Sequence, residues 1–294
     1  MSEDLRGADL SGADLSGVYL RGADLTDANL SNADLMEGTK MKNATLARAI
    51  ADRAAFSFEF HFEEHPDRPA DLSGSNLSNA SFRQSRMNGV NLSEANLSQT
   101  DLSGTTLKHA KLMQANLSGA ILTGVDLTGA DLHGAILVDA NLQGVNLDGA
   151  DLYGANLQGA NLGNRKLMGA NLAGADLTDA DLSIAYLIRA DLSQANLTNA
   201  DLSGADLSGA ILVGSNFSGA KLNETDLSWA YLYKAKLIRA DLSDANLIGA
   251  RFGETDLTDA DLTGASLNID KSLGPELDIA KFGAHVFASF CIGS

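Results

Sequence analysis

The chain has 294 residues and a formal net charge of −17, and only 5% of its residues are aromatic. Hydrophobic residues make up 45% of it, which excludes a disordered acidic chain. Cys291 is the single cysteine, so no internal disulfide can form. The acidic balance argues against direct binding of nucleic acid. The N-terminus does not look like a secretory signal and no apolar run is long enough to span a membrane, so we expect a cytoplasmic protein without membrane contacts.

Leucine recurs every five residues along most of the chain. The spacing runs from Leu5 to Leu35 and, without a slip, from Leu72 to Leu267. The exceptions in the longer run are Phe82, Met87, Phe217 and Phe252. A small residue, usually Ala, stands two positions before most of these leucines, and Asp or Asn usually stands directly before them. A period of five fits neither a continuous helix nor a flat strand, so each pentapeptide is interpreted as a short edge followed by a two-residue corner.

These A(D/N)LSG units, such as residues 205–209, resemble the repeats of the pentapeptide-repeat family. The resemblance covers about 250 of the 294 residues. It implies an all-β fold, a right-handed quadrilateral β-helix with four pentapeptides in each coil. To this solenoid we add a C-terminal helical cap, because the last coil would otherwise expose leucines and unpaired backbone groups.

Four segments are expected from the places where the repeat changes. Residues 1–56 would form N-terminal coils with a register shift near 36–40, and 57–69 a protruding loop. Residues 70–269 would form the main solenoid, and 270–294 the cap. Within the first segment, residues 44–56 are interpreted as further coil. An alanine-rich helix remains the alternative there, because Ala, Leu and Arg favour helices.

The loop carries three phenylalanines that alternate with polar residues. Phe58, Phe60 and Phe62 would suit an alternating strand or hairpin and are candidate contacts, since loops on rigid scaffolds often carry function. His61 and His65 beside two glutamates raise the alternative of a metal site. Their spacing matches no metal motif, so we expect no metal there.

The tail begins like a helix at Gly274-Pro275-Glu276, with proline in the first turn. Its apolar residues are numerous enough to seal the last coil and to contact a second subunit, so we expect a homodimer through this segment. The candidate cap and dimer residues are Leu277, Phe282, Val286, Phe287 and Phe290. Elsewhere, Arg165 occupies a position that should face inward, where an unpaired charge is costly. A local bulge that frees its side chain is the expected solution, and a functional distortion is the alternative.

Nothing in the repeat predicts catalysis, a cofactor or a metal ion. Catalytic groups of different types must converge in a pocket, and a leucine-filled solenoid offers none. With 20 residues in a coil, Asp181 would stack on Asp201 and Asp206 on Asp226. Such outward columns are expected to be solvated rather than paired catalytic acids. The sequence therefore predicts a chain that is not an enzyme.

Two functions remain. The first is a structural scaffold or protein-interaction rod with an unknown partner. The alternative comes from the family resemblance, because quinolone-resistance members bind DNA gyrase as DNA mimics. The acidic charge fits that alternative, but the regular leucine repeats differ from the resistance proteins, whose repeats are richer in phenylalanine.

One stretch departs from the acidic character of the chain. Over residues 211–251, five basic residues face four acidic ones. Ile211, Tyr231 and Arg251 are 20 residues apart, so they should stack on one face, with Trp229 and Tyr233 on either side. Exposed aromatics beside basic groups are enriched at interfaces, which predicts a partner-binding patch. Surface drift in a tolerant repeat is the alternative interpretation.

Overall fold

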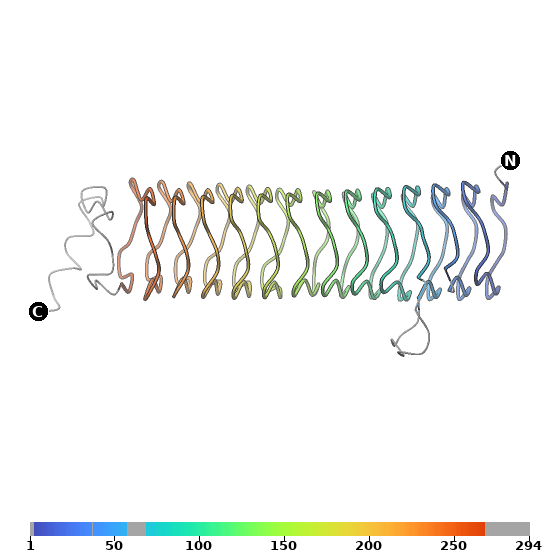
Figure 1. Cartoon of the computed structure of the whole chain (residues 1–294), viewed down its shortest axis with the longest axis horizontal. Coiled ribbons are helices and arrows are strands. Elements are labelled where there is room, and N and C mark those ends of the chain that lie inside the picture. The colour runs from blue at the N-terminus through green and yellow to red at the C-terminus, as the bar shows by residue number, and fades with distance from the viewer. Residues whose placement is uncertain (1–2, 37, 58–68, 268–294) are drawn as a thin grey trace, which may run out of the picture. The chain divides into compact units, whose positions relative to one another are not determined.

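A computed structural model describes residues 3–36, 38–57 and 69–267 (Figure 1). Within these ranges there is no helix and no continuous strand; single-residue parallel β-bridges alternate with two-residue turns. The candidate loop contacts Phe58, Phe60 and Phe62 and the expected helical cap at 270–294 lie outside the described residues. The chain divides into two compact units, 1–152 and 153–294, which are described separately.

Each coil in both units contains four pentapeptides. In unit 1, Asp71 bridges Asn91, and Asn76, Ser81 and Arg86 bridge the residues 20 positions further on. In unit 2, the bridge from Asn156 to Asp176 has the same spacing. Four bridges for every 20 residues give a coil with four edges. The bridges therefore form the quadrilateral β-helix that the family resemblance implies.

Two insertions in unit 1 leave the four edges in register. The bridges from Tyr19 to Lys40 and from Asp34 to Ala55 each span 21 residues, which is one more than the regular coil. The next coil needs 31, from Lys40 to Asp71, which accommodates eleven extra residues. Thr45, Ile50 and Ala55 all form coil bridges. Residues 44–56 are therefore coil rather than an alanine-rich helix.

The leucine and alanine positions face inward and are buried along both units. Leu207 and Ala205, for example, are almost fully buried. The backbone is satisfied by the neighbouring coil, because Leu207 N donates to Asp226 O (2.7 Å) and Asp226 N donates to Ala205 O (2.9 Å). Burial of a leucine side chain contributes about 1.5–3 kcal/mol. The repeated leucines thus supply most of the hydrophobic stabilisation.

The corners explain why the repeat contains Asp or Asn before leucine and Gly two residues after it. Asp206 Oδ1 accepts a hydrogen bond from Ser208 N (2.9 Å), which closes the corner. The second corner residue, here Gly209, has a φ of 65°. Left-handed backbone is accessible to glycine and tolerated by Asn and Asp, but it is costly for bulky side chains. The consensus therefore encodes a turn of defined geometry.

The expected bulge at Arg165 is absent. Arg165 N still donates to Leu162 O (3.2 Å), and Tyr186 N donates to Arg165 O (2.9 Å), as at a regular position. The side chain is half-buried, and its Nη1 donates to Asn164 O (3.1 Å). The long arginine side chain reaches the surface across the corner, so the backbone needs no distortion.

Candidate functional site

The stacked carboxylates of unit 2 form hydrogen-bonded columns. Asp206 bridges Asp226, whose Oδ1 accepts a hydrogen bond from Asn246 Nδ2 (3.1 Å). Lys221 Nζ lies 3.0 Å from Asp201 Oδ2. Burial works to raise the pKa of Asp201, but hydrogen bonds from Ser203 and the charge of Lys221 outweigh it and lower the pKa. The neighbours of Asp201 therefore favour its ionised form, so it does not resemble a catalytic acid.

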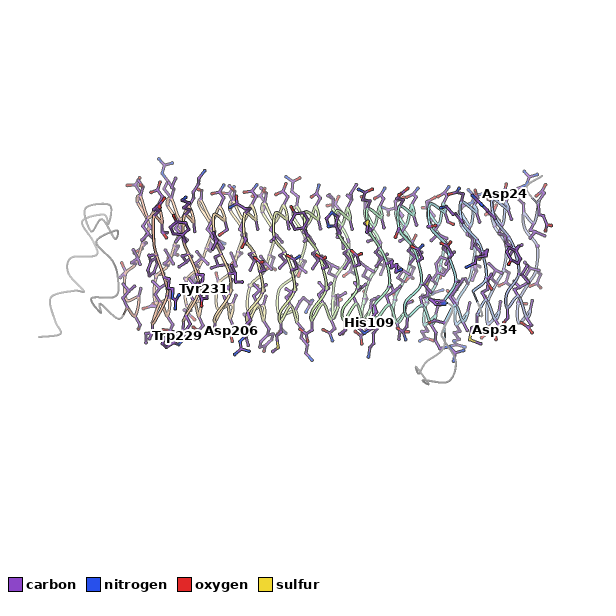
Figure 2. The ribbon with its side chains drawn as sticks, in the orientation of Figure 1. Asp24, Asp34, His109, Asp206, Trp229 and Tyr231 are labelled. Carbon is purple, nitrogen blue, oxygen red and sulfur yellow. The ribbon has the colours of Figure 1, made fainter. Side chains whose placement is uncertain are left out.

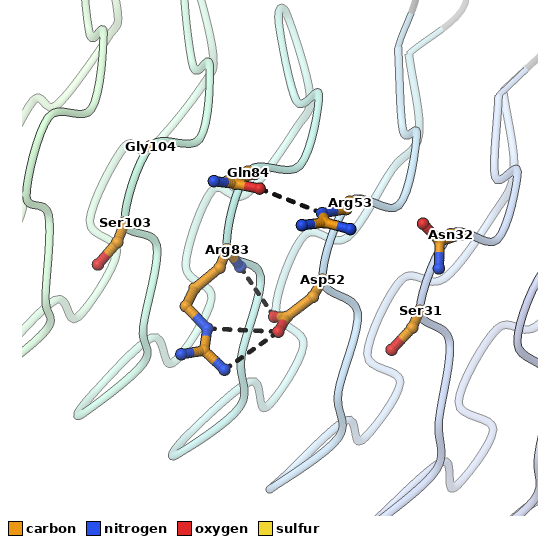
Figure 3. Close-up of a pocket in the computed structure, with 8 residues that line it drawn as sticks. All are labelled: Ser31, Asn32, Asp52, Arg53, Arg83, Gln84, Ser103 and Gly104. Carbon is orange, nitrogen blue, oxygen red and sulfur yellow. Dashed lines mark hydrogen bonds and ion pairs between the residues drawn. The ribbon is translucent and has the colours of Figure 1, made fainter.

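The structure contains a hollow of about 560 Å³ on one corner of unit 1 (Figure 3). Its lining residues come from four successive corners and are Ser31, Asn32, Asp52, Arg53, Arg83, Gln84, Ser103 and Gly104. Arg83 Nη2 lies 3.2 Å from Asp52 Oδ2, and Arg53 Nε donates to Gln84 Oε1 (3.1 Å). Because Asp52 and Arg83 neutralise each other, the hollow offers hydrogen bonds rather than an acid–base pair.

No metal site is found among the residues that the structure describes, where no three His, Cys, Asp or Glu side chains are placed to hold an ion. His61 and His65 lie outside those residues. In the described ranges there is also no helix with the length and hydropathy of a membrane span.

The most distinctive surface lies in unit 2 and is called the aromatic strip, defined by Ile211, Trp229, Tyr231, Tyr233 and Arg251. Ile211 bridges Tyr231, which bridges Arg251, so these three share one edge on successive coils. Trp229 and Tyr233 occupy the corners on either side of Tyr231. Figure 2 shows Trp229 at a corner and Tyr231 on the adjacent edge. Trp229 is 66% exposed and Tyr231 40%, so large apolar surface faces solvent.

Charged side chains of the neighbouring repeats hold the aromatic rings in place. The Arg251 guanidinium carbon lies 4.8 Å from the centre of the Tyr231 ring. Tyr233 Oη donates to Glu254 Oε1, and Lys234 Nζ lies 3.6 Å from Glu254 Oε2. Hydrogen bonding to Tyr233 raises the pKa of Lys234, and the charge of Glu254 acts in the same direction. The rings are therefore positioned rather than free.

Trp229 is positioned by a glycine in the next coil. An ideal Cβ on Gly249 would lie 2.8 Å from Trp229 Cδ2, so the indole ring packs directly against the glycine backbone. Trp229 also has a φ of 59°. A left-handed residue that is neither Gly nor Asn costs roughly 1–2 kcal/mol. Other bulky residues also occupy this left-handed corner, such as Ile184 and Arg189 (φ 56° for each), so Trp229 shares its backbone cost with other corners.

The edge of the aromatic strip also lacks the hydrogen bond that closes regular corners. Ile211, Tyr231 and Arg251 replace the usual Asp or Asn, so their side chains cannot accept the N–H two residues later. In the described part of the chain, Val213 N and Tyr233 N have no intramolecular acceptor. A typical hydrogen bond of this kind contributes about 1 kcal/mol. Three consecutive coils therefore give up local stability at one surface.

The structure brings together all five residues that the sequence placed in a patch, and whether the patch binds a partner stays a prediction. Sequence reasoning missed two supporting residues, Gly249 and Glu254. Both could have been found, because Gly249 stands 20 residues after Trp229 and Glu254 stands 20 residues after Lys234. The predicted loop and cap residues lie outside the described ranges.

The repeat of this chain is similar to the repeats of known proteins. The family model described as pentapeptide repeats matches residues 4–37 and, in overlapping segments, 70–268. No curated protein sequence matches the chain. Among solved structures, HetL from the cyanobacterium Nostoc sp. strain PCC 7120, a pentapeptide repeat protein involved in heterocyst differentiation regulation, is 39% identical. The match covers 66% of this chain and 84% of HetL, with a TM-score of 0.29.

Two other similar structures come from different settings. A pentapeptide repeat protein from the Arabidopsis thaliana thylakoid lumen is 35% identical over 33% of this chain and 70% of that chain, with a TM-score of 0.26. QnrB1, a plasmid-mediated fluoroquinolone resistance protein, is 15% identical over 92% and 91% of the two chains, with a TM-score of 0.25. The TM-scores are low, so the assignment rests on the sequence repeat. By the family model, this chain belongs to the pentapeptide repeat family.

Proposed function

We propose that this chain is a non-catalytic scaffold that binds a protein partner through the aromatic strip of unit 2. The observation that carries the proposal is the exposed row Trp229, Tyr231 and Tyr233, held in place by neighbouring repeats. Aromatic residues and arginine are enriched at the centres of protein interfaces.

A double mutant tests this proposal against a matched control. Trp229→Ala with Tyr231→Ala should lose a partner that wild-type protein captures from the native host. The control is Ile184→Ala with Tyr186→Ala, because Ile184 and Tyr186 are also exposed and occupy the same repeat positions on a different edge. All five side chains of the aromatic strip face outward, so the fold should survive. Equal capture by both mutants and by wild type would remove the aromatic strip as the binding face.

The alternative function is a DNA-mimicking binder of DNA gyrase, as the family resemblance implies. The observation that favours it is the column of stacked carboxylates in unit 2, where Asp181 bridges Asp201 and Asp206 bridges Asp226. A gyrase supercoiling assay with and without a fluoroquinolone separates the two functions. Protection of gyrase by the wild-type chain would support the alternative, and unchanged inhibition by the drug would exclude it.

The remaining features of the scaffold are proposals of the same kind. We expect a cytoplasmic protein with no cofactor, no metal and no direct contact with nucleic acid or membrane. We expect residues 270–294 to cap the solenoid as a helix and to support a homodimer. The segment boundaries 1–56, 57–69, 70–269 and 270–294 remain predictions.

A further inference from the structure

The cations of unit 2 differ in whether a nearby carboxylate compensates their charge. Lys221, Lys234 and Arg239 each lie within 4.0 Å of a carboxylate oxygen, namely those of Asp201, Glu254 and Asp259. Arg251 has no such partner in the described part of the chain and lies instead on the Tyr231 ring. Arg189 likewise has no carboxylate within that distance among the described residues. Lys166 and Lys236 also lack a carboxylate within that distance among the described residues, and Arg189 and Arg251 are the two arginines in this uncompensated group.

Arg189 borders the aromatic strip, and Arg251 belongs to it. The Arg189 corner stacks on the corner of Gly209, which stacks on the corner of Trp229, as the hydrogen bonds Arg189 N to Ser208 O and Gly209 N to Ser228 O show. Arg189 Cγ would lie 3.6 Å from an ideal Cβ on Gly209, so its stem extends along that corner. Arg251 is itself the last residue of the aromatic strip, one coil beyond Tyr231. The apolar surface of the strip therefore lies between the corner of Arg189 and the edge position of Arg251.

We infer that the partner bound at the aromatic strip presents an acidic segment, with carboxylates for Arg189 and Arg251 and an apolar side chain for the surface between them. This inference rests on the proposed function. Arginine suits the role because its planar guanidinium can stack on an aromatic ring and still bind a carboxylate through two hydrogen bonds. Complementary charge also aligns a partner before its apolar contacts form.

The acidic character of the rest of unit 2 makes this charge pattern specific. The columns that contain Asp181, Asp201, Asp206 and Asp226 would repel an acidic segment, so it would be directed to the aromatic strip. A basic partner, such as a DNA-binding surface, would show the opposite preference. The charge of the partner therefore separates this inference from the gyrase alternative.

Trp229 is the only tryptophan, so its fluorescence reports directly on the aromatic strip. The probe is a random copolymer of glutamate and tyrosine, added to the full chain at physiological salt, and a lysine–tyrosine copolymer serves for comparison. The glutamate copolymer should change Trp229 emission in a saturable manner. Arg189→Glu combined with Arg251→Glu should weaken this binding about tenfold or more, the loss expected when close charge pairs are reversed.

The control is Lys166→Glu, because Lys166 is exposed, has no carboxylate within 4.0 Å in the described ranges, and lies on another edge of unit 2. It should leave binding unchanged. Arg251→Lys should weaken binding less than Arg251→Glu, because it keeps the charge but loses the planar group. Absence of any saturable response to the glutamate copolymer, or equal effects of the Lys166 and arginine reversals, would overturn the inference. The proposed function would then still stand if Trp229→Ala with Tyr231→Ala lost the natural partner.

Discussion

Replacement of Ile211 by asparagine should stabilise the protein while it damages the proposed binding face. The Ile211 side chain occupies a position where Asp206 and Asn216 each accept the N–H two residues later (2.9 and 3.1 Å). Asparagine at this position should accept the free N–H of Val213 in the same way. The expected gain is about 1 kcal/mol, the typical net contribution of such a hydrogen bond. The unfolding equilibrium constant would then fall about fivefold.

Ile211→Ala is the control, because it removes the same apolar side chain without adding an acceptor. The two variants should be compared by urea unfolding, followed through Trp229 fluorescence one coil away, and by hydrogen exchange of the Val213 amide. Hydrogen exchange is informative because solenoids can unfold locally rather than in one step. The asparagine variant should be more stable than the alanine variant and should protect the Val213 amide. Equal unfolding midpoints and equal exchange would refute the proposed role of the corner hydrogen bond.

Four further outcomes follow from the structure. Leu157→Asp should abolish folding, because it buries an unpaired charge among leucines, and a soluble variant with unchanged melting would contradict the inward assignment. Gly249→Ala should destabilise the protein by roughly 1–2 kcal/mol and shift Trp229 emission, since the new Cβ meets the indole ring at a φ of 75°; Gly159→Ala, which meets no neighbour, would not shift the emission. The pKa of Asp201 is lowered in the folded protein, so the contribution of its carboxylate to stability is present above the ordinary pKa of about 3.9 and is lost as the pH falls through the lower folded pKa. Wild type and Asp201→Asn should therefore converge in stability below about pH 4. Light scattering should give about twice 30.6 kDa, and a clean monomer would exclude the dimer.

The short edges and corners could be predicted from the sequence because each pentapeptide defines its own local geometry, whereas the number of four edges in a coil came from the family resemblance. Leucine five residues apart defines the inward positions, and residues such as Gly209 define the left-handed corners. Even the coils around Thr45 and Ile50 could be recognised, because the spacing resumed after a shift of one residue. The prediction of a bulge at Arg165 was wrong for a physical reason. The sequence showed a charge at an inward position, but it did not show that the arginine side chain could reach the surface across the corner.

The residues of the aromatic strip could also be predicted from the sequence, because a coil of 20 residues brings Ile211 beside Tyr231. What the sequence could not supply was the packing of one ring against another residue. The contact of Trp229 with Gly249 and the position of Arg251 on Tyr231 depend on side-chain directions across coils. The pairing of some cations and not others likewise needed three-dimensional distances, and it is this pairing that indicates the charge of the partner.

The proposed contact between the aromatic strip of unit 2 and a protein partner can be tested directly. Its most direct test places a photoreactive phenylalanine derivative at position 231 and, in a second variant, at position 166, and irradiates each variant in the native host. Position 231 should yield a discrete crosslinked protein, and that product should be absent from position 166 and should disappear when Trp229→Ala is added. The same crosslinked products from both positions, or none from position 231, would contradict the account.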